Sequence, residues 1–179
     1  MMKLMGLSYC YLCGGQLVKQ SDRFVCLGCR QEIFENPKPC VEIAIFNKEN
    51  QILLAKRATD PFRGKYDLPG GFMDVDDDSL EMALRREISE ELSIKFEDIK
   101  NVRYALSYTS KYPWGKDTYN NIAVTFLGQN YSDKIEAKDD VESLHWFDPD
   151  KIDKSELASP KLGKVIDKLV KYNKSEEEC

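Results

Sequence analysis

The sequence lacks a long apolar run and has a single histidine. No stretch of its 179 residues approaches the roughly 18 apolar residues that a membrane-spanning helix needs. The opening MMKLMGLSY is also too short for a signal-peptide apolar region. We therefore expect a cytoplasmic protein with no membrane partner. His145 lies in a predicted strand, where a surface position is more common than catalysis, so the general base should be a carboxylate.

The chain also lacks an excess of positive charge. Its 26 Lys and Arg stand against 31 Asp and Glu, which gives a net charge of −5 and a pI near 5.1. Binding nucleic acid mainly through its phosphates requires a basic surface, so a nucleic-acid partner is not expected. A hydrophobic content of 42% at this length allows one main domain plus a small module.

We expect three parts: a cysteine-rich unit over 1–35, a main domain over 36–174 and a flexible tail over 175–179. The prolines of Asn36-Pro37-Lys38-Pro39 favour an extended linker at the first boundary. In the main domain, hydrophobic periodicity predicts two helices and a mixed sheet that they cover, which is an α/β fold. The predicted strands cover 41–46, 51–57, 102–112, 122–127 and 143–147, and the predicted helices cover 78–92 and the region around 162–169.

Four cysteines near the start form two knuckles, Cys10-x2-Cys13 and Cys26-x2-Cys29. In a reducing compartment disulfides are rare, and this spacing is typical of four thiolates around Zn²⁺. With all four positions taken by sulfur, the zinc would be structural. The alternative is a set of free or disulfide-bonded cysteines.

The predicted helix over 78–92 carries unusual acidity. Eight acids and two arginines between Asp74 and Glu91 give this segment a net charge of −6, so the rest of the chain sums to +1. At 100° per residue, Glu87 and Glu91 fall in line with Leu84 on the inward face, and Glu90 lies on the flank. Oxygen ligands at this spacing suit Mg²⁺ or Mn²⁺. The alternative is a solvated acidic face.

Gly70 and Gly71 precede this helix and follow Leu68-Pro69. Glycine lets the backbone approach a ligand closely, so the Gly71 carbonyl is a further candidate for the metal shell. The alternative is an ordinary turn.

Residues 71–94, GFMDVDDDSLEMALRREISEELSI, resemble the Nudix box, whose pattern is G-x5-E-x7-R-E-U-x-E-E-x-G-U. The resemblance implies a Nudix α/β/α sandwich, preceded here by a small zinc ribbon. It implies a hydrolase in which Glu87, Glu90 and Glu91 bind the metal and Arg86 orients a neighbouring glutamate.

Two positions depart from the pattern. Asp78 stands in place of the box's first glutamate and is separated from Gly71 by six residues instead of five, which predicts a longer turn before the helix. We expect Asp78 to cap that helix, with Glu81 three residues later. Ser93 replaces the glycine after the helix, where a left-handed conformation is often needed.

A four-cysteine ribbon followed by FENPKP and a Nudix box is similar to the NADH pyrophosphatase branch. The branch's Pro-Trp-Pro-Phe-Pro core is reduced here to Pro113-Trp114. We therefore expect a small nucleotide substrate of a broad class, a nucleoside diphosphate derivative of the NADH/NAD or ADP-ribose type. The family resemblance also suggests a homodimer. Two alternatives stay open: a nucleotide-sensing regulator whose ribbon contacts nucleic acid or protein, and a hydrolase that cleans the nucleoside triphosphate pool.

The hypothesised reaction is attack of a metal-bound water on one phosphorus of the diphosphate. Glu90 is the first candidate for the general base, and Asp140, an acid found before the Trp-Phe pair in similar family members, is the second. Candidate substrate-binding residues are aromatic or basic, although sheet packing and surface charge are the simpler alternatives. They are Arg57, Arg63, Tyr108, Tyr112 and Trp114.

Overall fold

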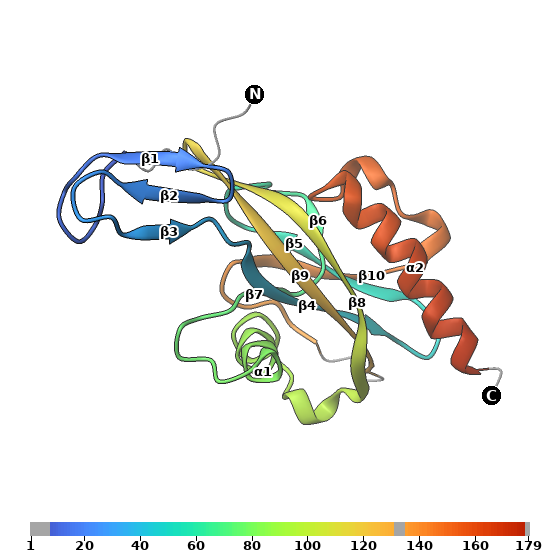
Figure 1. The fold of residues 1–179 in the computed structure, drawn as a ribbon. Coiled ribbons are helices and arrows are strands. Elements are labelled where there is room, and N and C mark those ends of the chain that lie inside the picture. The colour runs from blue at the N-terminus through green and yellow to red at the C-terminus, as the bar shows by residue number, and fades with distance from the viewer. Residues whose placement is uncertain (1–7, 131–134, 178–179) are drawn as a thin grey trace. The chain divides into compact units, whose positions relative to one another are not determined.

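The computed structural model describes residues 8–130 and 135–177 of the chain (Figure 1). The chain forms two compact units. Unit 1 combines residues 1–38 with residues 111–121, and unit 2 combines residues 39–110 with residues 122–179.

Unit 1 contains a small three-stranded antiparallel sheet. Its strands are β1 (Leu17–Gln20), β2 (Arg23–Cys26) and β3 (Glu32–Phe34), in the order β1-β2-β3. Two cysteines form part of its small buried cluster, which consists of Cys10, Leu17, Phe24 and Cys26 with Ile33 packed against them. So few apolar side chains cannot stabilise an independent fold, and units of this size usually need a metal or disulfides.

A second, seven-stranded sheet is the framework of the main domain, with the order β10-β5-β4-β9-β8. Two short strands lie off this path, because β6 pairs with β5 and β7 pairs with β4. The strands are β4 (Lys38–Phe46), β5 (Ile52–Arg57), β6 (Tyr66–Asp67), β7 (Gly70–Phe72), β8 (Lys100–Trp114), β9 (Asp117–Gln129) and β10 (Val141–Phe147). The predicted hairpin of β4 and β5 is confirmed, and the side-chain oxygen of Asn47 accepts hydrogen bonds from the Glu49 and Gln51 amides in its turn.

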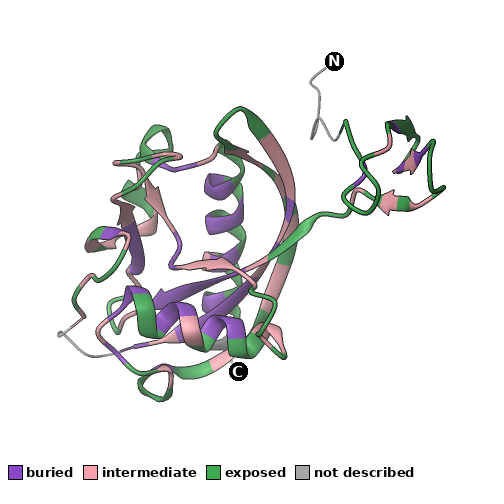
Figure 2. Cartoon of the chain, turned by 90° about the vertical axis from the view of Figure 1, so that its left-hand side faces the viewer, coloured by how far each residue is buried: buried purple, intermediate pink, exposed green. Residues whose placement is uncertain are grey.

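Two helices cover opposite faces of this sheet. The apolar side chains of β4 point alternately to the two faces, so each face has an apolar core for one helix to pack on. Val41, Ile43 and Ile45 pack in the core on the side of α1 (Leu80–Glu91). Ala44 and Phe46 pack in the core on the side of α2 (Pro160–Glu177). Figure 2 shows buried residues on the helices and on the sheet between them. The predicted α/β/α sandwich with a mixed sheet is therefore confirmed.

Three short 3-10 helices complete residues 8–130 and 135–177: η1 (Phe96–Asp98), η2 (Pro149–Lys151) and η3 (Lys154–Glu156). Helix α2 reaches Glu177, so it includes the first residues of the expected tail. In the described part of the chain, no helix combines the length and the apolar character that crossing a membrane would require.

The prediction that Asp78 caps α1 is wrong. Ser79 is the N-cap, and its hydroxyl oxygen accepts a hydrogen bond from the Met82 amide at 3.2 Å. A serine next to the first helical residue reaches this amide directly, so the helix begins one residue later than the box pattern suggested.

Candidate active site

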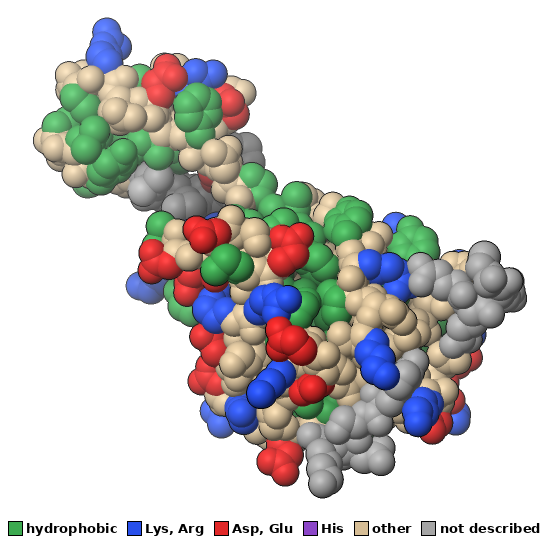
Figure 3. All heavy atoms as spheres, turned by 90° about the horizontal axis from the view of Figure 1, so that it is seen from below, with side chains coloured by type: hydrophobic (Ala, Val, Ile, Leu, Met, Phe, Trp, Pro, Cys, Tyr) green, Lys and Arg blue, Asp and Glu red, His purple; other side chains and the backbone are tan. Residues whose placement is uncertain are grey.

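Helix α1 directs two carboxylates inward. Glu87 is 9% exposed and Glu91 is 8% exposed, and they follow the buried Ala83 and Leu84 along the helix. Glu90 lies on the flank and is exposed. The predicted inward position of Glu87 and Glu91 is therefore confirmed. Viewed from the side that carries α1, acidic and basic side chains alternate over the surface (Figure 3), so it is no continuous acidic face.

The two glycines of β7 are required by close packing. A Cβ at Gly70 would lie 2.1 Å from the Val41 carbonyl oxygen, and Gly70 also has a φ of +141°. A Cβ at Gly71 would lie 2.4 Å from Oε1 of Glu87. The Gly70 amide donates a hydrogen bond of 2.8 Å to Oε2 of Glu91. The glycine pair therefore does more than form a turn, since it brings backbone against both buried carboxylates.

The guanidinium of Arg86 connects helix α1, strand β7 and the loop before the helix by hydrogen bonds. Its guanidinium donates to Oε1 of Glu87 at 2.8 Å, to Oε2 of Glu90 at 3.1 Å and to the Phe72 carbonyl at 3.0 Å. It also donates to both carboxylate oxygens of Asp77, at 3.3 Å and 2.8 Å. The hydrogen bond from Arg86 lowers the pKa of Asp77, and the same bond raises the pKa of Arg86.

This network corrects the alignment to the box. Asp77, five intervening residues after Gly71, is the acid that pairs with Arg86, whereas Asp78 is exposed. The additional residue of this chain therefore lies between Asp77 and Arg86, beside the helix start at Ser79.

Burial dominates the electrostatics of the inward carboxylates. It raises the pKa of Glu91 to about 9, and it also raises the pKa of Glu87. The charge of Asp140, in the turn before β10, raises both pKa values further. Burying like charges together is unfavourable unless a cation compensates them. Two buried carboxylates beside Gly71 are thus a donor set that fits a hard divalent ion.

Two further buried acids were not identified from the sequence. Glu42 on β4 accepts hydrogen bonds from the Thr125 hydroxyl at 2.6 Å and from the Tyr108 hydroxyl at 3.1 Å. Burial raises the pKa of Glu42 to about 7 and the pKa of Asp67 on β6 to about 6. One signal was available for Glu42, because it is the single charged residue inside the apolar run of residues 41–46.

The substrate-binding candidates fall in both units. In unit 2, Arg57 donates to the Pro61 carbonyl at 2.8 Å and lies 3.8 Å from Asp67, while Arg63 is exposed in the loop between β5 and β6. Tyr108 contacts Glu42, as described above. Tyr112 and Trp114 belong to unit 1, where their rings stack on each other.

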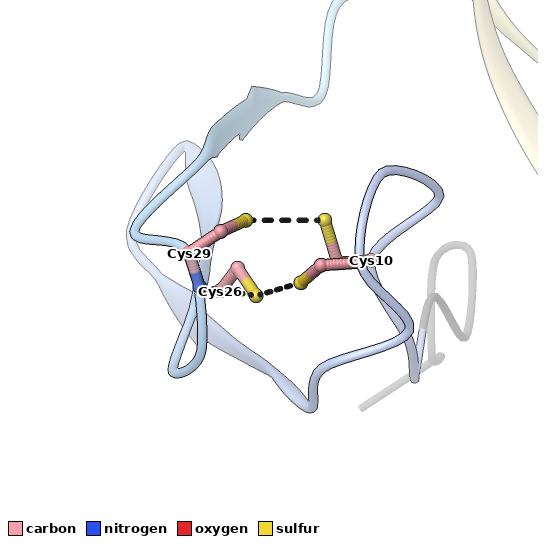
Figure 4. A group of neighbouring side chains, drawn as sticks. Cys10, Cys26 and Cys29 are labelled. Carbon is pink, nitrogen blue, oxygen red and sulfur yellow. Dashed lines mark hydrogen bonds between the residues drawn. The ribbon is translucent and has the colours of Figure 1, made fainter.

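The four cysteines of the two knuckles converge in unit 1. The Sγ atoms of Cys10 and Cys29 are 3.7 Å apart, and those of Cys13 and Cys26 are 3.5 Å apart (Figure 4). All four sulfur atoms lie within 4.8 Å of one another, and none forms a disulfide. A hydrogen bond from the Cys29 amide lowers the pKa of the Cys26 thiol to about 6, which favours the thiolate at this position. The neighbouring thiols, Cys13 first, and burial raise the pKa of Cys29.

The sandwich fold, the glycine pair and the acidic helix together define a Nudix domain. The chain belongs to this family, because the family model described as NUDIX domain matches residues 36–169. It is 35% identical over 130 residues to the NAD-capped RNA hydrolase NudC of Photobacterium profundum, an alignment that covers 72% of this chain and 44% of that protein. It is 29% identical over 142 residues to the ADP-ribose pyrophosphatase of Methanocaldococcus jannaschii, covering 79% and 76% of the two chains.

A solved NUDIX hydrolase from Nitrosomonas europaea shares the fold with a TM-score of 0.67. It is 23% identical to this chain, and the match covers 92% of this chain and 91% of that one. The chain spans about half the length of the NudC relatives that it matches.

Proposed function

We propose that this chain is a metal-dependent Nudix hydrolase that cleaves the diphosphate linkage of a nucleoside diphosphate derivative. The observation that carries the proposal is the pair of buried carboxylates, Glu87 and Glu91. They pack against β7, where a side chain at Gly71 would collide with the carboxylate of Glu87. Such a pair is costly in a protein that binds nothing there.

The proposed ligands are the carboxylates of Glu87, Glu90 and Glu91 and the carbonyl of Gly71. All are oxygen donors, which suit Mg²⁺ or Mn²⁺ better than a soft metal. When bound, such an ion lowers the pKa of the attacking water and offsets charge on the leaving phosphate. The proposed zinc is separate: it would be held by the four thiolates of unit 1 and would have a structural role.

The protein's own groups fix the geometry of the carboxylates. Arg86 donates to both Glu87 and Glu90, so it sets their distance from each other, and Asp77 in turn holds Arg86. The Gly70 amide fixes Glu91. Outer partners of this kind orient metal ligands and change activity when they are removed.

Glu90 is the proposed general base, because it is the exposed member of the three glutamates and can meet a water that enters from solvent. Asp140 is the second candidate, since its charge acts on both Glu87 and Glu91. A pH–rate profile distinguishes the two assignments, because removing the general base removes its ascending limb. Glu90→Gln loses this limb if Glu90 is the base, and Asp140→Asn loses it if Asp140 is the base.

The substrate class rests on the relatives. Their names refer to NAD-capped RNA and to ADP-ribose, and NAD and ADP-ribose both contain a diphosphate between two ribosyl groups. We infer a substrate of the NADH/NAD or ADP-ribose type. Arg57 and Arg63 are the proposed phosphate contacts, and Tyr108 is the proposed nucleoside contact in unit 2. Tyr112 and Trp114, the stacked pair of unit 1, stay proposed substrate contacts.

The proposal is tested by a Mg²⁺-dependent hydrolysis panel. It contains NADH, NAD⁺, ADP-ribose, NAD-capped RNA, diadenosine polyphosphates and nucleoside triphosphates. Glu90→Gln and Glu91→Gln are run beside Glu81→Gln, an exposed glutamate on the same helix. We expect each of the first two variants to lose at least about 100-fold in kcat/KM, roughly 3 kcal/mol, and Glu81→Gln to retain activity.

Mn²⁺ binding gives a second readout that does not depend on turnover. Electron paramagnetic resonance should detect Mn²⁺ bound by the wild-type chain and weaker binding by Glu91→Gln. Absence of turnover on every compound, or wild-type rates in both glutamate variants, would falsify the catalytic proposal.

A further inference from the structure

The carboxylate of Glu42 on β4 is a buried charge that the proposed metal site does not use. Its Oε1 accepts a hydrogen bond of 2.6 Å from the Thr125 hydroxyl on β9, and its Oε2 accepts one of 3.1 Å from the Tyr108 hydroxyl on β8. Among residues 8–130 and 135–177, no lysine, arginine or histidine forms an ion pair with it. An ionised carboxylate buried without a counter-charge costs stability, so packing alone does not account for a glutamate here.

Glu42 lies next to the proposed metal ligands through strand β7. It pairs with Gly70 in the ladder between β4 and β7, and the Gly70 amide donates to Oε2 of Glu91 at 2.8 Å. Asp67 on β6 lies near both acids, because its charge adds to the effect of burial in raising the pKa of Glu42 and that of Glu91. In a nucleoside diphosphate the ribose separates the phosphates from the base, so the base can reach residues that lie beside the metal ligands.

The cover over this face of β4 decreases toward Glu42. Phe46 and Ala44 are 1% and 0% exposed, and both belong to the core that packs against α2. Glu42 follows on the same face at 9%, and Cys40 beyond it is only partly buried. The ring of Tyr108 is also only partly buried. A ligand can therefore approach the carboxylate from the side of Cys40 and Tyr108.

We propose that Glu42 selects the base of the substrate by accepting hydrogen bonds from N–H donors on that base. This inference rests on the proposed hydrolysis of a nucleoside diphosphate derivative. An ionised carboxylate only accepts hydrogen bonds and has about four lone-pair sites, of which the two hydroxyls occupy one on each oxygen. The remaining sites take an exocyclic amino or carboxamide group and repel a carbonyl or carboxylate oxygen. Adenine carries such an amino group, and nicotinamide carries such a carboxamide.

Two analogues of NAD⁺ separate these two sources of the donor. The hypoxanthine analogue replaces the amino group of adenine by oxygen, and the nicotinic acid analogue replaces the carboxamide by a carboxylate. Each is compared with NAD⁺ by kcat/KM in Mg²⁺, with the full-length, zinc-loaded chain. The wild type should prefer NAD⁺ over one of them by about 10- to 100-fold, because a site built to pair with an N–H group loses that hydrogen bond. The disfavoured analogue identifies the base that faces Glu42.

Glu42→Gln assigns the preference to this residue. Glutamine has nearly the same shape, but its amide donates as well as accepts, so the preference for NAD⁺ should fall at least about tenfold. The matched control is Asp67→Asn, which removes the neighbouring charge. It should change the rates for NAD⁺ and both analogues by the same factor and leave their ratio unchanged. Circular dichroism verifies that both variants are folded.

Isothermal titration calorimetry without Mg²⁺ gives a readout that does not depend on turnover. If no compound is hydrolysed, the proposed function fails, whereas the ratio of affinities for NAD⁺ and its analogues still tests Glu42. The inference is overturned if the wild type binds none of the three, if it does not distinguish NAD⁺ from either analogue, or if Glu42→Gln keeps the wild-type ratio. The last result would leave Glu42 as a buried acid with a structural role.

Discussion

Replacing Glu91 by glutamine should stabilise the protein in the absence of divalent ions while it abolishes activity. Burial raises the pKa of Glu91 to about 9, compared with an ordinary value of 4.5. The folded protein therefore holds this proton more tightly than the unfolded chain does. Stability from the protonated group is complete below pH 4.5 and is lost as the pH rises toward 9. Glutamine cannot ionise, and its oxygen can still accept the Gly70 amide hydrogen bond, so the variant avoids this loss.

The magnitude follows from the pKa difference. Each pKa unit corresponds to about 1.4 kcal/mol, so the variant should gain about 2 kcal/mol at pH 6 and roughly 4 to 5 kcal/mol at pH 8. These values are upper limits, because water entry and relaxation reduce the cost of ionisation. For a chain of this size, the gain raises the melting temperature by about 5 °C at pH 6 and by on the order of 10 °C at pH 8.

Urea and thermal unfolding, followed by circular dichroism at pH 5, 6, 7 and 8, measure this difference. The protein is dialysed free of Mg²⁺ and its zinc content is verified. Added Mn²⁺ should reduce the advantage of Glu91→Gln, because the ion stabilises the wild-type carboxylate by binding. Glu81→Gln, exposed on the same helix, is the control and should be no more stable than the wild type. A Glu91→Gln variant no more stable than wild type at pH 8, or an advantage that does not grow with pH, would refute the reasoning.

Three further predictions concern the rest of the site and the ribbon. Gly71→Ala places a Cβ 2.4 Å from Oε1 of Glu87, so Mn²⁺ affinity, measured by electron paramagnetic resonance, should fall at least about tenfold. Arg86→Lys keeps the charge but loses the fork of hydrogen bonds, so kcat should fall about 10- to 100-fold in steady-state assays. Cys10→Ser with Cys13→Ser should remove about one zinc per chain by atomic emission; full zinc retention would contradict the assignment.

The sequence was most informative where geometry is local. Glu87 and Glu91 lie on the same face of the helix as Leu84, a position that depends only on the helical repeat, and both carboxylates are buried as expected. The four cysteines meet as their spacing predicted. The β4–β5 hairpin is likewise set by the alternation and turn residues around Asn47.

Features that depend on distant parts of the chain were missed. Glu42 is buried because Tyr108 and Thr125, from two other strands, provide its hydrogen bonds. Strand order cannot be read from hydrophobic alternation, so the pairing was not predictable. The choice of Asp78 over Asp77 failed for a related reason: counting back from Arg86 assumes the spacing of a pattern, whereas the side chain of Arg86 selects the acid it can reach.

The charge balance of the Arg86 network supports the proposal that the three glutamates bind a cation. Asp77 alone offsets the single positive charge of Arg86, because its carboxylate takes two of the guanidinium hydrogen bonds. Glu87, Glu90 and Glu91 then retain a formal charge of −3 when ionised, and two of them are buried. One divalent ion would reduce this formal charge to −1. In the proposed site Arg86 would not substitute for the metal. Its hydrogen bonds to Glu87 and Glu90 would orient these two carboxylates, and the raised pKa of Glu91, caused mainly by burial, gives the direction of the cost of ionising this group without a cation.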